Sequence, residues 1–255
     1  MLAFQRNQPE RRITMIEYLV LAVAPGIFWL WFFWRKDKFE REPASYIVRT
    51  FLLGAAVVLP AAFIENFLSV GEGVTDMMIV GVVEELGKFL AVYLYVYRKS
   101  EFNEVMDGII YSAAASLGFA SLENLFYIME FGPGVIVGRA ILSTLGHVLF
   151  ASFWGYALGL KKITGKNTVF TGLILSMAAH GIYNALLTTE FLLSAVLVIV
   201  FMIILYRSMS GKIKKSLAMS PFTTTEDSRT GAVCPQCGNT LPEHSTYCPN
   251  CGRKI

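Results

Sequence analysis

The sequence predicts an all-α bundle of about seven membrane-spanning helices followed by a small metal-binding module. Of its 255 residues, 55% are hydrophobic and 16% are charged, and the mean hydropathy is +0.53. Soluble domains carry about 25% charged residues, so an ordinary soluble enzyme is excluded. The apolar residues form long blocks, and all four cysteines lie near the C-terminus. A net charge of +3 without a concentrated basic face argues against nucleic-acid binding.

The long apolar blocks predict the spans. A helix needs about 20 apolar residues to cross about 30 Å of hydrocarbon, and only a helix or a closed barrel satisfies its backbone there. The first block is too long for a signal peptide and ends in a tryptophan-rich interfacial belt, so we expect it to be retained. The predicted spans are 16–34, 47–70, 77–97, 108–130, 135–160, 168–188 and the short 191–206.

The positive charges in the connecting loops predict the orientation, because Lys and Arg are retained on the cytoplasmic side. Thirteen of them lie in four alternate loops, and the three intervening loops have none. This places the N-terminus outside the cell and the C-terminus in the cytoplasm. Arg6, Arg11 and Arg12 disagree but are outnumbered. The basic loops are 35–46, 98–107, 161–167 and 207–220; the others are 71–76, 131–134 and 189–190.

The C-terminal tail contains two CxxC knuckles after a polar segment, 207–233, that we interpret as a cytoplasmic linker. The knuckles are Cys234–Cys237 and Cys248–Cys251, and their thiolates can hold a tetrahedral zinc ion. A disulfide framework is the alternative, but thiols stay reduced in the cytosol. We therefore predict a structural zinc ribbon over 234–255, with no open position for catalysis. It could bind a cytosolic protein.

Several spans carry ionisable or amide side chains, which are functional candidates because a charge near the bilayer centre costs roughly 2.5 kcal/mol or more. Any one of these residues alone more often forms a polar contact between helices or is part of an ion path. Glu65, nearer a span end, could merely reach water, and Arg139 could extend to the interface. The candidates are Glu84, Glu85 and Lys88 in the third span, Glu123 and Asn124 in the fourth, His147 in the fifth, and His180 and Asn184 in the sixth.

The spacing of these residues indicates a single site. Glu84 and Lys88 are four apart on one helix face, so Lys88 could hold one carboxylate ionised while its neighbour exchanges a proton. His180 and Asn184 repeat the spacing and could hold a water or an oxyanion. At about 1.5 Å per residue, the acids and histidines lie roughly 11 to 18 Å below the outer surface, so four spans could converge there.

In this order, Glu84-Glu85-x-x-Lys88, Phe119-x-x-x-Glu123-Asn124, His147 and His180-x-x-x-Asn184 resemble the PrsW family of intramembrane proteases, over roughly residues 16–206. That family is distantly similar to type II CAAX prenyl endopeptidases and bacteriocin self-immunity proteins, whose second motif ends in His where this chain has Glu123. Further segments look like the family's signature stretches: Ala24-Pro25-Gly26, Asp37 to Pro43, Asp107-Gly108, Gly118-Phe119-Ala and Gly155 to Gly159.

The resemblance implies hydrolysis of a membrane-anchored protein, typically an anti-sigma factor, at the start of regulated proteolysis. It implies Glu84 or Glu85 as the general base, His147 and His180 polarising the water or carbonyl, Asn184 at an oxyanion, and Lys88 holding the glutamate pair. Glu123 would orient a histidine or join both histidines on a catalytic metal. The mechanism could be metal-dependent or metal-free.

Two functions from other classes use the same residues. A proton-coupled transporter would employ the acids and histidines as a relay, although no inverted repeat is detectable. A non-catalytic scaffold or sensor would act through the cytoplasmic zinc ribbon.

Overall fold

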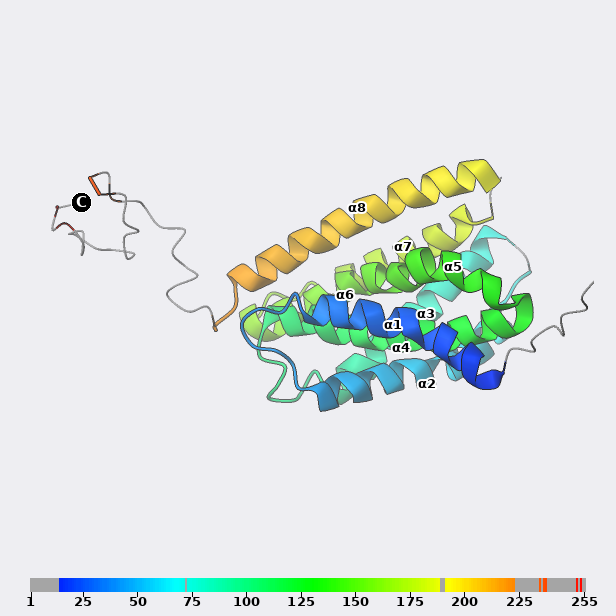
Figure 1. Ribbon diagram of the computed structural model, residues 1–255, viewed down its shortest axis with the longest axis horizontal. Helices are drawn as coiled ribbons and strands as arrows, with labels where there is room; N and C mark the ends of the chain where they lie inside the picture. The colour runs from blue at the N-terminus through cyan, green and yellow to red at the C-terminus, as the bar shows by residue number, and fades with distance from the viewer. Residues whose placement is uncertain are drawn as a thin grey trace, which may run out of the picture.

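The structure, a computed structural model, describes residues 14–71, 73–188 and 191–222, together with 234, 236, 237, 251 and 253 of the tail. Its described part is all helical, which confirms the predicted fold class. The long helices lie side by side along a common direction (Figure 1). They are α1 (Met15–Trp34), α2 (Ala44–Leu68), α3 (Val74–Tyr95), α4 (Val105–Phe131), α6 (Thr144–Thr164), α7 (Val169–Leu186) and α8 (Phe191–Ala218), with short η1 (Pro133–Val135), α5 (Ile136–Gly138) and π-helical η2 (Arg139–Ser143) leading into α6.

Six helical segments of the described chain are long and apolar enough to cross a membrane, so the protein is a multi-pass membrane protein. The remaining long helix, α3, carries the charged residues Asp76, Glu84, Glu85 and Lys88. Because of them, α3 is less apolar than the other long helices and is not among the six. One predicted boundary was wrong. Helix α8 continues to Ala218, so the first part of the expected linker 207–233 is helical.

Helix α4 lies at the centre of the bundle and packs against α1, α2 and α6. Most of its residues, including all of Val105–Ser121, are buried, because helices cover it on several sides. Small residues permit these close contacts, as is usual where membrane helices associate. A Cβ atom on Gly108 would overlap the Gly155 carbonyl of α6, and one on Gly118 would overlap the Phe51 carbonyl of α2.

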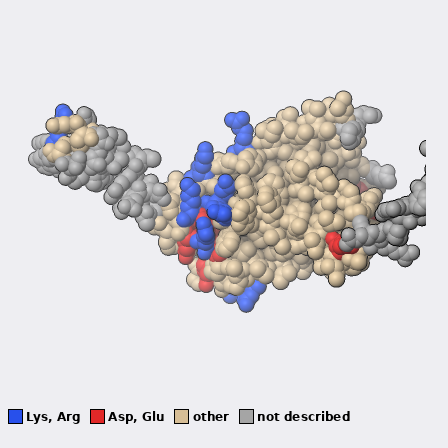
Figure 2. Space-filling model, viewed as in Figure 1, with Lys and Arg blue, Asp and Glu red and all other residues tan. Residues whose placement is uncertain are grey.

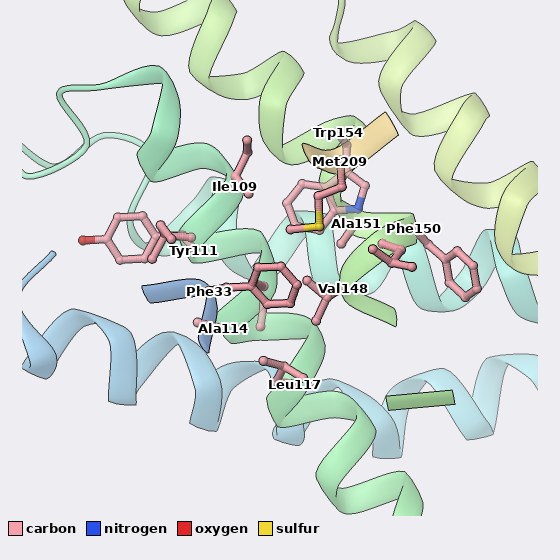
Figure 3. Packing of buried hydrophobic residues seen from close by; sticks show 14 of the residues in the cluster. Phe33, Ile109, Tyr111, Ala114, Leu117, Val148, Phe150, Ala151, Trp154 and Met209 are labelled. Atoms are coloured by element: carbon pink, nitrogen blue, oxygen red, sulfur yellow. The ribbon is translucent and has the colours of Figure 1, made fainter. Parts of the chain in front are cut away.

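A continuous apolar core surrounds α4. Figure 3 shows part of this core, to which α1 contributes Phe33, α4 contributes Leu117, α6 contributes Val148 and α8 contributes Met209. The indole of Trp154 is fully buried here and reaches toward α3. There it packs edge to face on the Phe89 ring, with the ring centroids 5.7 Å apart. This core therefore also supports the polar residues of α3.

Helices α3 and α7 approach each other through glycines. A Cβ atom on Gly81 would lie 2.7 Å from the backbone nitrogen of Gly181. Glu85 is one helical turn beyond Gly81, and His180 directly precedes Gly181. This close crossing therefore brings the acid of one helix to the histidine of the other.

Candidate active site

The ionisable side chains of four helices meet in one buried cluster, as their common depth predicted. Glu84, Glu85 and Lys88 come from α3, Glu123 from α4, His147 from α6 and His180 from α7. These members are joined by contacts of 2.6 to 3.8 Å. Glu123, His147 and His180 lie nearer the ends of their helices that are remote from the basic loops, whereas Glu84, Glu85 and Lys88 lie at or just past the middle of α3.

Glu85 is the most fully satisfied member. It is completely buried, and its Oε2 accepts hydrogen bonds from Trp154 Nε1 at 3.0 Å and Ser176 Oγ at 2.7 Å. Its Oε1 lies 2.6 Å from Lys88 Nζ and accepts from His180 Nδ1 at 3.1 Å. A carboxylate with four partners is held ionised and fixed in place. The sequence offered no specific signal for Trp154 or Ser176.

Lys88 links both glutamates rather than one. Its Nζ lies 3.2 Å from Glu84 Oε2, in addition to the shorter contact with Glu85, and it donates to His147 Nδ1 at 3.1 Å. The side chain is completely buried, with Nζ 4.5 Å from the centre of the Phe119 ring. The expectation that Lys88 pairs with one carboxylate and leaves the other free was therefore wrong, because the side chain reaches between them.

A carboxylate orients each histidine ring. His180 donates from Nδ1 to Glu85, so its Nε2 carries the lone pair and lies 3.8 Å from Glu84 Oε2. His147 contacts Glu123 Oε2 through Nε2 at 3.0 Å, and its Nδ1, which accepts from Lys88, is 3.8 Å from the same Glu84 oxygen. Each ring thus places its unprotonated nitrogen 3.8 Å from the same Glu84 oxygen.

One ligand atom each from Glu84, His147 and His180 lies within 4.8 Å of the others. Two imidazole nitrogens and one carboxylate oxygen are a donor set for zinc with an open fourth position. Glu85 and Glu123 occupy the outer positions that commonly orient metal-bound histidines. The residues therefore fit a catalytic metal, with Glu84 rather than Glu123 as the third ligand, because Glu123 contacts the opposite nitrogen of His147.

Arg139 is part of this site, although the sequence suggested only a residue near a span end. It lies in the π-helical turn η2, an irregularity frequent at functional sites. Its Nη2 contacts Glu123 Oε2 at 2.7 Å and its Nε donates to Asn124 Oδ1 at 2.7 Å. An arginine within a predicted span was the signal that could have identified it.

A cavity of about 320 Å³ gives access to the cluster. Glu84, Glu123, Arg139, His147, His180 and Asn184 line it, and it extends to Leu187 and Thr188 at the end of α7. His180 and Asn184 share the cavity, as their spacing predicted. Glu85 and Lys88 do not line it. A neighbouring cavity contains Glu65 and Asp76 and shares Val80 with the first.

The described part of the tail brings together three of the predicted zinc ligands. Cys234, Cys237 and Cys251 each offer a sulfur within 4.8 Å of the others. The backbone N–H of Gln236 lowers the pKa of Cys234 to about 6, which favours the thiolate that zinc binds. Cys248, the fourth predicted ligand, lies outside the described residues.

The fold and the site together define a multi-pass membrane protein with a buried carboxylate–histidine centre of the kind that supports hydrolysis. Residues 42–208 match the family model of the PrsW family intramembrane metalloprotease, and residues 233–255 match a zinc-ribbon domain. The chain belongs to the PrsW family, and it is an intramembrane peptidase with a structural zinc ribbon. These matches favour the peptidase over the transporter and scaffold alternatives.

Relatives named Protease PrsW extend over most of the chain. The protein of Geobacillus kaustophilus is 36% identical over 69% of this chain and 82% of its own length. That of Bacillus subtilis is 34% identical over 68% of this chain and 84% of its own length. That of Clostridioides difficile is 31% identical over 78% and 91%. No solved structure significantly matches the chain.

Proposed function

We propose that the chain cleaves a membrane-anchored protein and that Glu84, rather than Glu85, takes part directly in the reaction. The observation that carries this assignment is the different surroundings of the two glutamates. Glu84 lines the cavity, whereas Glu85 is enclosed by Lys88, Trp154, Ser176 and His180. Only a carboxylate facing the cavity can accept a proton from an attacking water there.

The other side chains hold this centre in place. Glu85 and Glu123 set the tautomers of His180 and His147, and Lys88 offsets the charge of the glutamate pair. Arg139 and Asn184 line the cavity, where their N–H groups can donate to the oxyanion that forms at the scissile carbonyl.

In a metal-bound form, Glu84, His147 and His180 would hold a zinc ion that lowers the pKa of a water and polarises a carbonyl, and Glu84 would then act as a ligand instead of as the base. Lys88 contacts two of the same three ligand atoms, Glu84 Oε2 and His147 Nδ1. The ammonium group and a metal therefore compete for this position, and the metal content of the protein decides between them.

The distribution of charge supports the orientation we propose for the chain. Figure 2 shows Lys and Arg gathered on the visible face at the end where α8 finishes. By the positive-inside rule, this supports a cytoplasmic location for this end and for the ribbon. The cavity reaches Thr188 near the opposite end of the bundle. This supports cleavage of a membrane-anchored anti-sigma factor near the outer side of the membrane. The family resemblance supplies that substrate class. The ribbon would then be free to bind a cytosolic protein.

The domain organisation we propose is a peptidase domain over 16–206, extended by the rest of α8, and a ribbon over 234–255. The match of the peptidase family to 42–208 and that of the zinc ribbon to 233–255 support this division.

The test is co-expression of candidate membrane-anchored anti-sigma factors with the full chain in a host that lacks it. Glu84→Gln and His180→Ala should reduce formation of the truncated product by about 10²-fold or more, the usual effect of losing a general base or its partner. Glu130→Gln, an exposed acid beyond the cavity, is the matched control and should cleave normally.

Two results would contradict the proposal in different ways. Undiminished cleavage by Glu84→Gln would refute the assignment of that residue. Failure of the wild-type protein to cut any anti-sigma factor, while it still cuts another membrane-anchored protein, would refute the substrate class alone.

A further inference from the structure

The irregular helical turn that leads into α6 places two residues of the site on the same side of one continuous helical segment. Arg139 begins the π-helical turn η2, and His147 lies in α6, eight residues later. Both side chains contact the same atom, Glu123 Oε2, at 2.7 and 3.0 Å. The two side chains therefore extend from their helical segment in nearly the same direction.

A regular α-helix would not produce this arrangement. Successive residues of an α-helix are about 100° apart, so Arg139 and His147 would differ by about 80° around the axis. The π turn contains one residue more than an α turn, and the Thr144 N–H accordingly donates to the carbonyl of Arg139. This extra residue removes about 100° and leaves the two side chains only about 20° apart.

The surroundings of the turn agree with this rotation. Arg139, Ser143 and His147 follow one another at intervals of four residues, and all three line the peptidase cavity. The opposite side of the turn, which includes Ala140 and Ile141, lines an apolar groove of about 440 Å³ together with residues of α1. The turn therefore has one face toward the site and one face toward α1.

Helix α1 contacts the turn through the indole of Trp29. Its Nε1 donates to the carbonyl of Ala140 at 2.8 Å, although the two residues are 111 positions apart in the chain. The ring is partly buried and packs edge to face on Phe32, with the ring centroids 5.6 Å apart. Because neighbouring rings fix the indole, its N–H holds one backbone atom of the turn in place.

Helix α4 holds the two ends of the turn. Arg139 Nε donates to Asn124 Oδ1 at 2.7 Å, and Asn124 Nδ2 donates to Thr144 Oγ1 at 3.0 Å. The guanidinium of Arg139 also lies over the Tyr127 ring, 3.7 Å from its centre. The position of the arginine thus depends on the number of residues between these two ends.

We infer that the π turn is a positioning element of the peptidase and that Trp29 is a positioning residue that maintains it. The extra residue directs Arg139 to Glu123, and Glu123 in turn orients His147. A π turn is rare and occurs mostly as a bulge within an α-helix, so contacts such as that of Trp29 are needed to keep it. The inference rests on the proposed function, because the site that the turn completes is the peptidase centre.

The first experiment measures kcat and KM for cleavage of one membrane-anchored substrate by the full chain. Trp29→Phe removes the indole N–H and should lower kcat about 3- to 10-fold with little change in KM, because losing one hydrogen bond shifts an equilibrium by about such a factor. Trp34→Phe is the matched control and should cleave normally. Trp34 lies in the same helix and donates to the backbone carbonyl of Glu42 at 3.2 Å, and neither residue lines the cavity.

A double-mutant cycle separates positioning from a general loss of structure. If Trp29 acts through Arg139, adding Trp29→Phe to Arg139→Lys should lower kcat by less than about 2-fold, because coupled residues do not have additive effects. The full effect of Trp29→Phe in that background would overturn the inference. A normal kcat for Trp29→Phe alone would do the same.

Removing the extra residue tests the turn itself. Deletion of Ile141, whose side chain is 61% exposed, should convert the turn to an α-helix and rotate Arg139 about 100° away from His147. The kcat should then fall about 10-fold or more, as for loss of the guanidinium contacts. Deletion of Gly134 shortens the same connection before Arg139 and should leave cleavage normal. Full activity after deletion of Ile141 would contradict the inference.

Backbone hydrogen exchange provides a measurement that needs no substrate. Trp29→Phe should speed exchange in residues 139–147 by about threefold or more, because local opening of the turn becomes easier, and Trp34→Phe should not. Equal exchange in the two variants would refute the role of Trp29. If the wild type cleaves no membrane-anchored protein, the proposed function fails, and the exchange measurement still decides whether Trp29 maintains the turn.

Discussion

The two adjacent glutamates provide the sharpest test of the site, because they should differ in their effect on stability. In Glu85→Gln, Lys88 loses its 2.6 Å partner while remaining completely buried, and an amide NH₂ must face donors such as Trp154 and Ser176. Removing one member of a buried ion pair costs about 3–5 kcal/mol. In Glu84→Gln, Lys88 keeps its shorter contact with Glu85 and the amide faces the cavity, so a loss of about 1 kcal/mol is expected.

The assay is thermal unfolding of both variants in the same detergent, followed by circular dichroism, together with cleavage of one substrate. At about 2–4 °C per kcal/mol for a chain of this size, Glu85→Gln should lower the Tm by about 6–20 °C and Glu84→Gln by about 2–4 °C. Both should lose cleavage. If Glu84→Gln destabilises the protein as much as Glu85→Gln, or if Glu85→Gln leaves the Tm unchanged, the division of roles is refuted.

Three further predictions concern other parts of the molecule. Arg139→Lys should lower kcat by about 10-fold or more at unchanged protein level, because Lys cannot reproduce the guanidinium contacts to Glu123 and Asn124; a normal kcat would exclude a role in the site. Gly108→Ala should lose about 1–3 kcal/mol in a chemical unfolding assay, because the new methyl group overlaps the α6 backbone, whereas full stability would show that the helices separate easily. Elemental analysis should find two zinc ions in the wild-type chain and one in His180→Ala, the other remaining in the ribbon; a single zinc in both proteins would establish a centre in which Lys88 takes the place of the metal.

Much of the fold was predictable because the membrane acts on local sequence. Apolar blocks of about 20 residues must become helices in hydrocarbon, and six helical segments of the described chain meet this criterion by composition. The least predictable boundary was the end of α8. The polar residues that follow Tyr206 are compatible with either a loop or a helix that leaves the bilayer, and the chain continues as a helix to Ala218.

The sequence by itself determined the candidate residues and their depth, because i, i+4 spacing on a helix and the charge pattern of the loops are local properties. Only the tertiary structure decided which glutamate faces the cavity. The partners that enclose Glu85, including Trp154 and His180, are 69 and 95 residues away in the chain. It also placed Arg139 beside Glu123. These contacts depend on how closely the helices cross at their glycines and on how each is rotated about its axis, and neither quantity is encoded in the period of a single helix.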